Sequence, residues 1–267
     1  MKIARFEHGG RIRFGVVEGE ELRVISGSPF AGIKPGRARL PLAGVRLLAP
    51  VEPPDVLAIG LNYRDHADEG GRPYPPAPVV FLKAGPAVTG PSMPIVLPAM
   101  APAEVDYEAE LAIVIGRPCR HVSEKEALDY ALGFTCGNDV SARDCQMRLD
   151  QQWARAKSFE TFCPLGPWIE TDMDPDAADI SLRLNGQTMQ ASNTRNLIFS
   201  CRRLISYCSR IFTLRPGTVI MTGTPAGVGH ARKPPVFLKP GDTVEVTIAG
   251  IGTLRNPVVA ADARGDA

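Results

Sequence analysis

Residues 106–115 read Asp-Tyr-Glu-Ala-Glu-Leu-Ala-Ile-Val-Ile, where apolar and other residues alternate and then merge into an aliphatic run. This pattern predicts a β-strand. Successive strand side chains point to opposite faces, so Glu108 and Glu110 share a face with Ala112 and Val114. If that face is buried, both carboxylates need a partner, because an isolated buried charge is costly. A hard divalent cation suits two such oxygen ligands, and the alternative is a strand whose first half is solvated.

The composition favours a fold of short strands. The chain has 267 residues, of which 44% are hydrophobic and 22% are charged, as in an ordinary globular protein. This length suits one large domain, or one domain with a small appendage. Its 26 glycines and 25 prolines are spread along the sequence and indicate many turns. Asn185-Gly186, between two strand patterns, is a strong hairpin signal. We therefore expect a mixed β fold with few helices (α+β).

Charge and cysteine usage exclude several classes of partner. The net charge of +1 gives no indication of binding to nucleic acid or to a membrane surface, and the apolar runs fall short of a membrane span. The six cysteines form no Cys-x-x-Cys pair, which is typical of a protein in the reducing cytoplasm. With only four histidines, the composition also disfavours a structural zinc site.

The first 50 residues differ in character from the rest. Residues 1–27 contain three short strand patterns separated by turns, which predicts a small β-meander. Prolines cluster near residue 50, between two apolar segments. We therefore expect a small N-terminal β domain at 1–50, without chemistry of its own, and a larger domain at 51–267.

A short helix is expected after residue 62. Asn62 is a suitable N-cap, and Gly70-Gly71 would end the helix after about two turns. His66 and Glu69 then lie at i,i+3 on one side, as a histidine and the carboxylate that orients it do in a general-base pair. The alternative is a surface helix with an ordinary histidine.

A second acidic residue follows another strand pattern. Residues 134–138 form a strand that ends at Asp139, which is either a third oxygen ligand or a turn residue that satisfies local backbone donors. Ser141 is then expected to cap a helix that places Arg143 and Gln146 three residues apart.

Two further segments are candidates for ligand contacts, and one is structural. Lys157 could hold a substrate carboxylate or form a salt bridge with a nearby acid. In residues 222–229 small side chains would let the backbone approach a ligand, to which Thr224 offers a hydroxyl and an N–H, unless this is a simple glycine turn. Residues 197–212 show helical periodicity, which we interpret as packing.

Taken in order, several stretches resemble the fumarylacetoacetate hydrolase superfamily, specifically its short, bacterial, dimeric type. Each stretch is a weak match by itself, but the ordered set is specific and covers about residues 50 to 258. The matching stretches are Gly60 to His66, Lys83 with Gly90-Pro91, Asp106 to Ile115, Asn138 to Asp144, Gln152-Trp153 with Lys157-Ser158-Phe159, and Thr222 to Gly229.

The resemblance implies a site, a fold and an assembly. The implied Mg²⁺ or Mn²⁺ ligands are Glu108, Glu110 and Asp139. The implied catalytic residues are His66, Glu69 and Lys157, and the implied substrate contacts are Arg143, Gln146 and Thr224. The implied fold is a mixed β-sandwich roll with a small N-terminal β domain, usually as a homodimer.

The chemistry that such a site supports begins with a 2-oxo acid whose carboxylate and 2-oxo oxygen are chelated by the cation. Bond cleavage or proton loss at C3 leaves an enolate, which the cation stabilises as a Lewis acid. A histidine base favours hydrolysis of the C3–C4 bond of 2,4-dioxo acids of the acylpyruvate or fumarylpyruvate type. Oxaloacetate-type decarboxylation, or dienedioate isomerisation in aromatic-acid catabolism, is the second hypothesis. A non-catalytic oxo-acid-binding protein is the third.

Overall fold

Strand β11 (Ala109–Ile115) lies inside the largest sheet, and all of its residues are buried. The computed structural model describes residues 1–261. Aliphatic side chains face both sides of β11, as expected for a strand that is covered on both faces. The predicted strand is interrupted, however: Val105–Asp106 forms a separate short strand, β10, and Glu108 precedes β11.

The largest sheet contains twelve strands and is mixed. β11 is antiparallel to both of its neighbours, whereas β17 and β6 are parallel. Along the main path the strands are β4 (Pro35–Pro41), β3 (Glu21–Ile25), β2 (Arg11–Glu18), β1 (Lys2–His8), β14 (Cys163–Glu170), β12 (Ala131–Asn138), β11, β17 (Val219–Met221), β6 (Val56–Gly60) and β7 (Val79–Lys83). Off this path, β5 (Arg46–Leu47) pairs with β1, and β8 (Val88–Thr89) pairs with β14.

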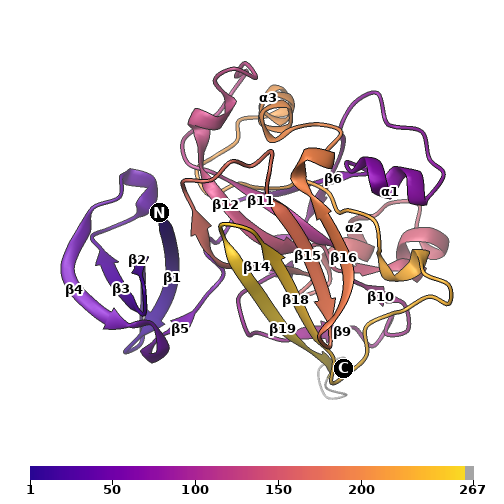
Figure 1. Ribbon diagram of the computed structural model, residues 1–267, viewed down its shortest axis with the longest axis horizontal. Coiled ribbons are helices and arrows are strands. Elements are labelled where there is room, and N and C mark those ends of the chain that lie inside the picture. Colours follow the sequence, from indigo (N-terminus) through magenta and orange to yellow (C-terminus); the bar gives the residue numbers. More distant parts are fainter. Residues whose placement is uncertain (262–267) are drawn as a thin grey trace.

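A second sheet covers one face of the first (Figure 1). Its strands, in pairing order, are β16 (Gln187–Asn193), β15 (Asp179–Leu184), β18 (Thr243–Ile248), β19 (Gly252–Ala260) and β9 (Ile95–Leu97). β18 and β19 contact β12 and β14, and one apolar core fills the space between the sheets. The expected hairpin joins β15 and β16, and both of its turn residues have positive φ. These layers confirm the mostly β fold class with mixed sheets and few helices.

The N-terminal strands lie at one side of the molecule, in indigo in Figure 1. They enclose a small core of their own, formed by Ala4, Phe6 and Leu22. β1 also pairs with β14 through Lys2 and Ile3, so the large sheet continues into this part of the chain. The expected domain boundary near residue 50 stays a prediction.

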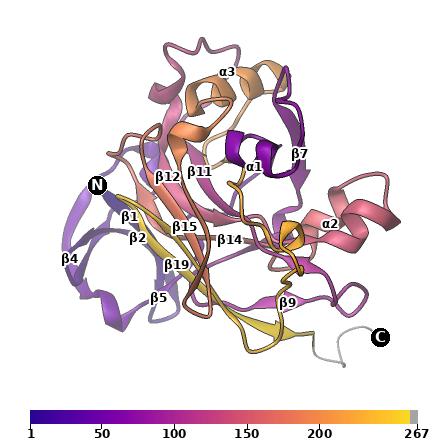
Figure 2. The same ribbon diagram turned by 45° about the vertical axis from the view of Figure 1, so that its right-hand side comes forward.

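Helices are short: they are α1 (Arg64–Glu69), α2 (Ala154–Ser158), α3 (Cys201–Ile211) and the π-helix Cys145–Leu149. Figure 2 shows α3 at the top and α2 at the right of the molecule. Short 3₁₀ turns cover Pro29–Ala31, Leu42–Gly44, Gly85–Ala87, Ala127–Tyr130, Thr194–Asn196 and Gly229–Ala231. Across residues 1–261, no helix has the length and apolarity that crossing a membrane would need.

Two predicted caps were wrong. Asn62 does not cap α1, since its amide bonds the backbone of Phe199 and Thr222, far along the chain. Ser141 lies in the short strand β13 (Ser141–Ala142), which pairs with β10, and its hydroxyl donates to the carbonyl oxygen of Asp139. In both cases a tertiary contact replaces the local role.

Candidate active site

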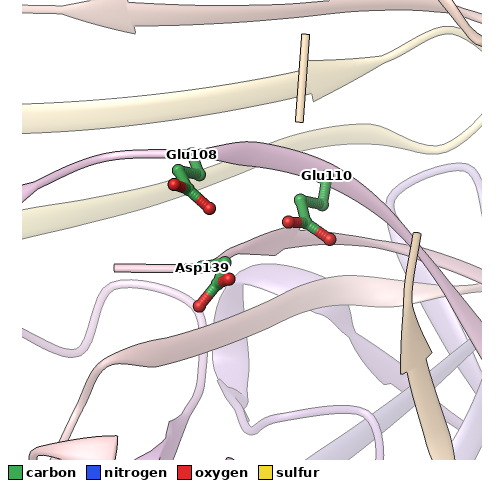
Figure 3. Close-up of side chains that lie close together, drawn as sticks. All are labelled: Glu108, Glu110 and Asp139. Carbon is green, nitrogen blue, oxygen red and sulfur yellow. The ribbon is translucent and has the colours of Figure 1, made fainter. Parts of the chain in front are cut away.

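Three buried carboxylates meet where β11 begins and β12 ends. Glu108 precedes β11, Glu110 lies in it, and Asp139 follows β12. Because Ala109 pairs with Asn138, the antiparallel register sets Asp139 beside Glu108, and the Asp139 N–H donates to the Glu108 carbonyl at 2.9 Å. One carboxylate oxygen from each residue lies within 4.8 Å of the others. Figure 3 shows both glutamates projecting toward the side where Asp139 lies.

Buried cations surround two of these carboxylates. Lys157 Nζ donates to Glu108 Oε2 at 2.9 Å and to Asp139 Oδ2 at 2.7 Å. Arg143 Nη2 donates to Glu108 Oε1 at 2.7 Å, and Lys83 Nζ donates to Asp139 Oδ1. Burial alone would raise the pKa of Glu108, but Lys157 and Arg143 together lower it, so Glu108 is ionised at neutral pH.

Glu110 has no cationic partner among residues 1–261. It accepts one hydrogen bond, from the Gly223 N–H at 2.7 Å. Burial, then the charges of Asp139 and Glu108, raise its pKa well above the ordinary value.

The donor set suits a hard divalent cation. Three carboxylates in one buried cluster are the ligand type that Mg²⁺ and Mn²⁺ prefer. A cation between them would also offset the charges of Asp139 and Glu108 that raise the pKa of Glu110. The residues present therefore fit the implied metal, and Mg²⁺ and Mn²⁺ are equally suited to them.

The helix α1 brings His66 and Glu69 to the same place. His66 Nδ1 lies 3.4 Å from Glu69 Oε2, and Glu69 accepts from the Gly227 N–H at 3.1 Å. This second bond attaches α1 to the loop after β17. Burial lowers the pKa of His66, so the imidazole is neutral at neutral pH and can accept a proton.

Arg143 and Gln146 are neighbours, as predicted, but the element is a π-helix preceded by β13. Arg143 Nη1 donates to Gln146 Oε1 at 2.7 Å. Thr224 is oriented by Gln190, whose Nε2 donates to the Thr224 hydroxyl oxygen at 2.8 Å. The hydroxyl proton of Thr224 is thereby left to donate elsewhere.

All nine residues singled out from the sequence line one cavity of about 240 Å³. Other side chains on its wall come from distant segments and include Arg72, Phe81, Trp153 and His230. The depression of about 540 Å³ that Leu97, Val236 and Leu238 line contains none of these nine residues. The sequence therefore located the residues that gather at this cavity, and their individual roles stay predictions.

Sequence reasoning missed three groups at the site. Lys83 was only part of a family match, Asp106 only the start of a strand, and His230 was not considered. Asp106 is fully buried and accepts a hydrogen bond from Arg143 Nε at 2.9 Å. Asp106 therefore orients Arg143, whose Nη2 donates to Glu108. A charged residue inside an otherwise apolar strand pattern was the available signal for both Lys83 and Asp106.

The fold and the cluster define a mostly β protein with a buried acidic centre that opens into a cavity. The chain belongs to the fumarylacetoacetate hydrolase family: the model described as fumarylacetoacetate (FAA) hydrolase C-terminal matches residues 55–259. A second model, described as Rv2993c-like, N-terminal, matches residues 1–50. Members of the family are enzymes, and they include isomerases, tautomerases and hydrolases.

Three relatives show the range of activities. The mitochondrial oxaloacetate tautomerase of Rattus norvegicus is 46% identical over 82% of this chain and 71% of its own. A crystal structure from Mycobacterium smegmatis, named 5-carboxymethyl-2-hydroxymuconate delta-isomerase, is 46% identical with a TM-score of 0.89, covering 97% of this chain and 100% of that one. A maleylpyruvate hydrolase from a Sphingobium species, solved with manganese(II) and pyruvate, is 33% identical with a TM-score of 0.79, covering 98% and 100%.

Proposed function

We propose that the protein is a divalent-cation-dependent enzyme that moves a proton on a 2-oxo acid, as a keto–enol tautomerase or dienedioate isomerase. The observation that carries this proposal is a neutral, carboxylate-oriented histidine beside a buried acidic cluster in one cavity. The names of two relatives at 46% identity, a tautomerase and an isomerase, support the reaction type.

Glu108, Glu110 and Asp139 would hold the cation. When bound, Mg²⁺ or Mn²⁺ would supply Lewis-acid stabilisation of negative charge on the substrate oxygens. The buried cluster contains four carboxylates, those three and Asp106, against the three cations Lys83, Arg143 and Lys157. With all four carboxylates ionised and a divalent cation bound, the net charge of this cluster would be +1, which favours an anionic substrate.

The protein's own side chains position the substrate and transfer the proton. Lys157 has three N–H donors, two of which bond Glu108 and Asp139, so one is left for a substrate carboxylate. The Thr224 hydroxyl donates to the same end of the substrate. His66 takes a proton from the substrate, and the charge that forms on its ring is stabilised by Glu69.

C–C hydrolysis of 2,4-dioxo acids is the second candidate, and the sequence alone placed it first. It is supported by the neighbour named maleylpyruvate hydrolase, whose structure contains manganese(II) and pyruvate. In that reaction His66 would take the proton from a water molecule instead of from the substrate. We also propose that the protein is a homodimer in the cytoplasm and that it binds neither nucleic acid nor a membrane.

Three reactions separate the candidates: the enol-to-keto conversion of oxaloacetate, its decarboxylation, and the cleavage of acylpyruvates, each assayed with Mg²⁺ and with Mn²⁺. We expect the largest kcat/KM for the proton transfer. A larger kcat/KM for acylpyruvate cleavage would instead support the hydrolase. Oxalate, which resembles the enolate of pyruvate, should inhibit competitively, and failure to bind it would contradict 2-oxo acid recognition.

A further inference from the structure

A second histidine lies on the cavity wall. His230 belongs to the 3₁₀ turn Gly229–Ala231, which follows the loop that carries Thr224. It lines the same cavity as His66, and its side chain is 27% exposed. Nothing in the proposed mechanism has used it so far.

Asp106 fixes the orientation of the His230 ring. Nδ1 of His230 lies 3.3 Å from Asp106 Oδ2, and the backbone N–H groups of Gly229 and His230 donate to the same carboxylate at 2.7 and 3.0 Å. Burial would raise the pKa of Asp106, but Arg143 and the hydrogen bonds from His230 lower it, so the carboxylate is ionised. An ionised carboxylate only accepts, so Nδ1 carries a proton and Nε2 is the ring nitrogen left for proton transfer.

Glycine at position 229 allows the turn to approach Asp106 closely. A Cβ added to Gly229 would lie 2.5 Å from Asp106 Oδ1 and 1.9 Å from the carbonyl oxygen of Val236, so only glycine permits the close approach. Nε2 of His230, in contrast, has no hydrogen-bond partner within the part of the chain that the structure describes.

The same loop holds both histidine–carboxylate pairs. The Gly227 N–H bonds Glu69, which orients His66, and two residues later the Gly229 N–H bonds Asp106, which orients His230. Two imidazoles, each with Nδ1 beside a carboxylate, therefore line one cavity of about 240 Å³. This arrangement is suited to a reaction that removes a proton at one substrate atom and adds one at another.

We propose that His230 is the second proton-transfer group of the enzyme and works together with His66 on one substrate. The proposal rests on the proposed proton-transfer function. In the enol-to-keto direction, the neutral imidazole of His66 takes the proton of the enol O–H, and the electron pair of that O–H bond forms the C=O. The C=C pair then takes a proton from the imidazolium form of His230 to form the new C3–H bond. One ring gains a proton and the other loses one, and exchange with water restores both.

The test compares His230→Gln with His230→Ala. Glutamine keeps a polar side chain but cannot transfer a proton, so kcat for oxaloacetate tautomerisation should fall about 10²-fold or more, while KM and the Kd of oxalate change less than about threefold. Added imidazole should restore part of the lost kcat in His230→Ala. His8→Gln is the matched control, since His8 is exposed at the end of β1 and lies outside the cavity.

The outcomes separate this inference from the proposed function. If the wild type tautomerises oxaloacetate and His230→Gln keeps its kcat, or changes only KM, the second-group role is overturned while the proposed function stands. If the wild type has no proton-transfer activity with any oxo acid, the proposed function fails and the inference fails with it. Thermal unfolding of each variant checks the fold, and should His230→Ala not fold, the kcat of His230→Gln decides.

Discussion

The same substitution at Glu108 and at Glu110 should change stability in opposite directions in the metal-free protein. Glu110 has a raised pKa, so the folded state retains a proton that the unfolded chain releases above the ordinary value of 4.5. Each pH unit above that value costs about 1.4 kcal/mol until the folded pKa is reached. The penalty therefore grows as the pH rises above 4.5 in the metal-free protein.

Glu110→Gln removes this penalty and can still accept the Gly223 N–H, so it should raise Tm, by about 2–4 °C for each kcal/mol gained. Glu108 has a lowered pKa, and its charge is stabilising above its unfolded pKa. Glu108→Gln removes the carboxylate that Lys157 and Arg143 share, so that only Asp139 and Asp106 remain as their buried ionic partners, and it should cost about 3–5 kcal/mol.

The assay is thermal unfolding after chelation, repeated from pH 4.5 to 7.5. The advantage of Glu110→Gln should vanish near pH 4.5 and grow with pH. Glu245→Gln, a half-exposed carboxylate on β18, is the control and should change stability by less than about 0.5 kcal/mol. Adding MnCl₂ at about 100 times Kd should stabilise the wild type by about 2.7 kcal/mol and leave Glu110→Gln unchanged. A metal-free Glu110→Gln protein that melts below the wild type would refute the reasoning.

Three more results are expected. His66→Gln should lower kcat about 10²- to 10⁴-fold with an unchanged oxalate Kd by calorimetry, and equal losses in both would mean that His66 only binds. Because burial lowers the pKa of His66, kcat/KM should fall on the acid side only below pH 6.5; a fall that begins above 6.5 in the pH–rate profile would contradict this base. Gly229→Ala should destabilise the protein by about 1–3 kcal/mol in urea unfolding, since its Cβ meets Asp106 and Val236, whereas Gly85→Ala, with open space around it, should be near neutral.

The sequence predicted what depends on local pattern. Strand alternation placed Glu108 and Glu110 on one face, and i,i+3 spacing paired His66 with Glu69, because both rules act over a few residues. Residue spacing offered metal-ligand and general-base roles only as alternatives, the family resemblance implied the full set, and these roles are still to be tested.

What local pattern could not supply is the set of contacts between distant segments. Asn62 looked like a helix cap but bonds residues 137 and 160 positions away, and Asp106 is held by a turn more than 120 positions later. Such contacts form only when the sheets pack together, so residue spacing along the chain cannot predict them.

The central claim is that Glu108, Glu110 and Asp139 hold the cation on which turnover depends. The most direct measurement is the rate of enol-to-keto conversion of oxaloacetate by chelated protein, titrated with Mn²⁺, in the wild type and in Glu110→Gln. The account predicts that the wild-type rate rises to a plateau at one Mn²⁺ per chain, and that the variant stays at the metal-free rate. Full activity of the chelated wild type, or an unchanged titration in Glu110→Gln, would contradict it.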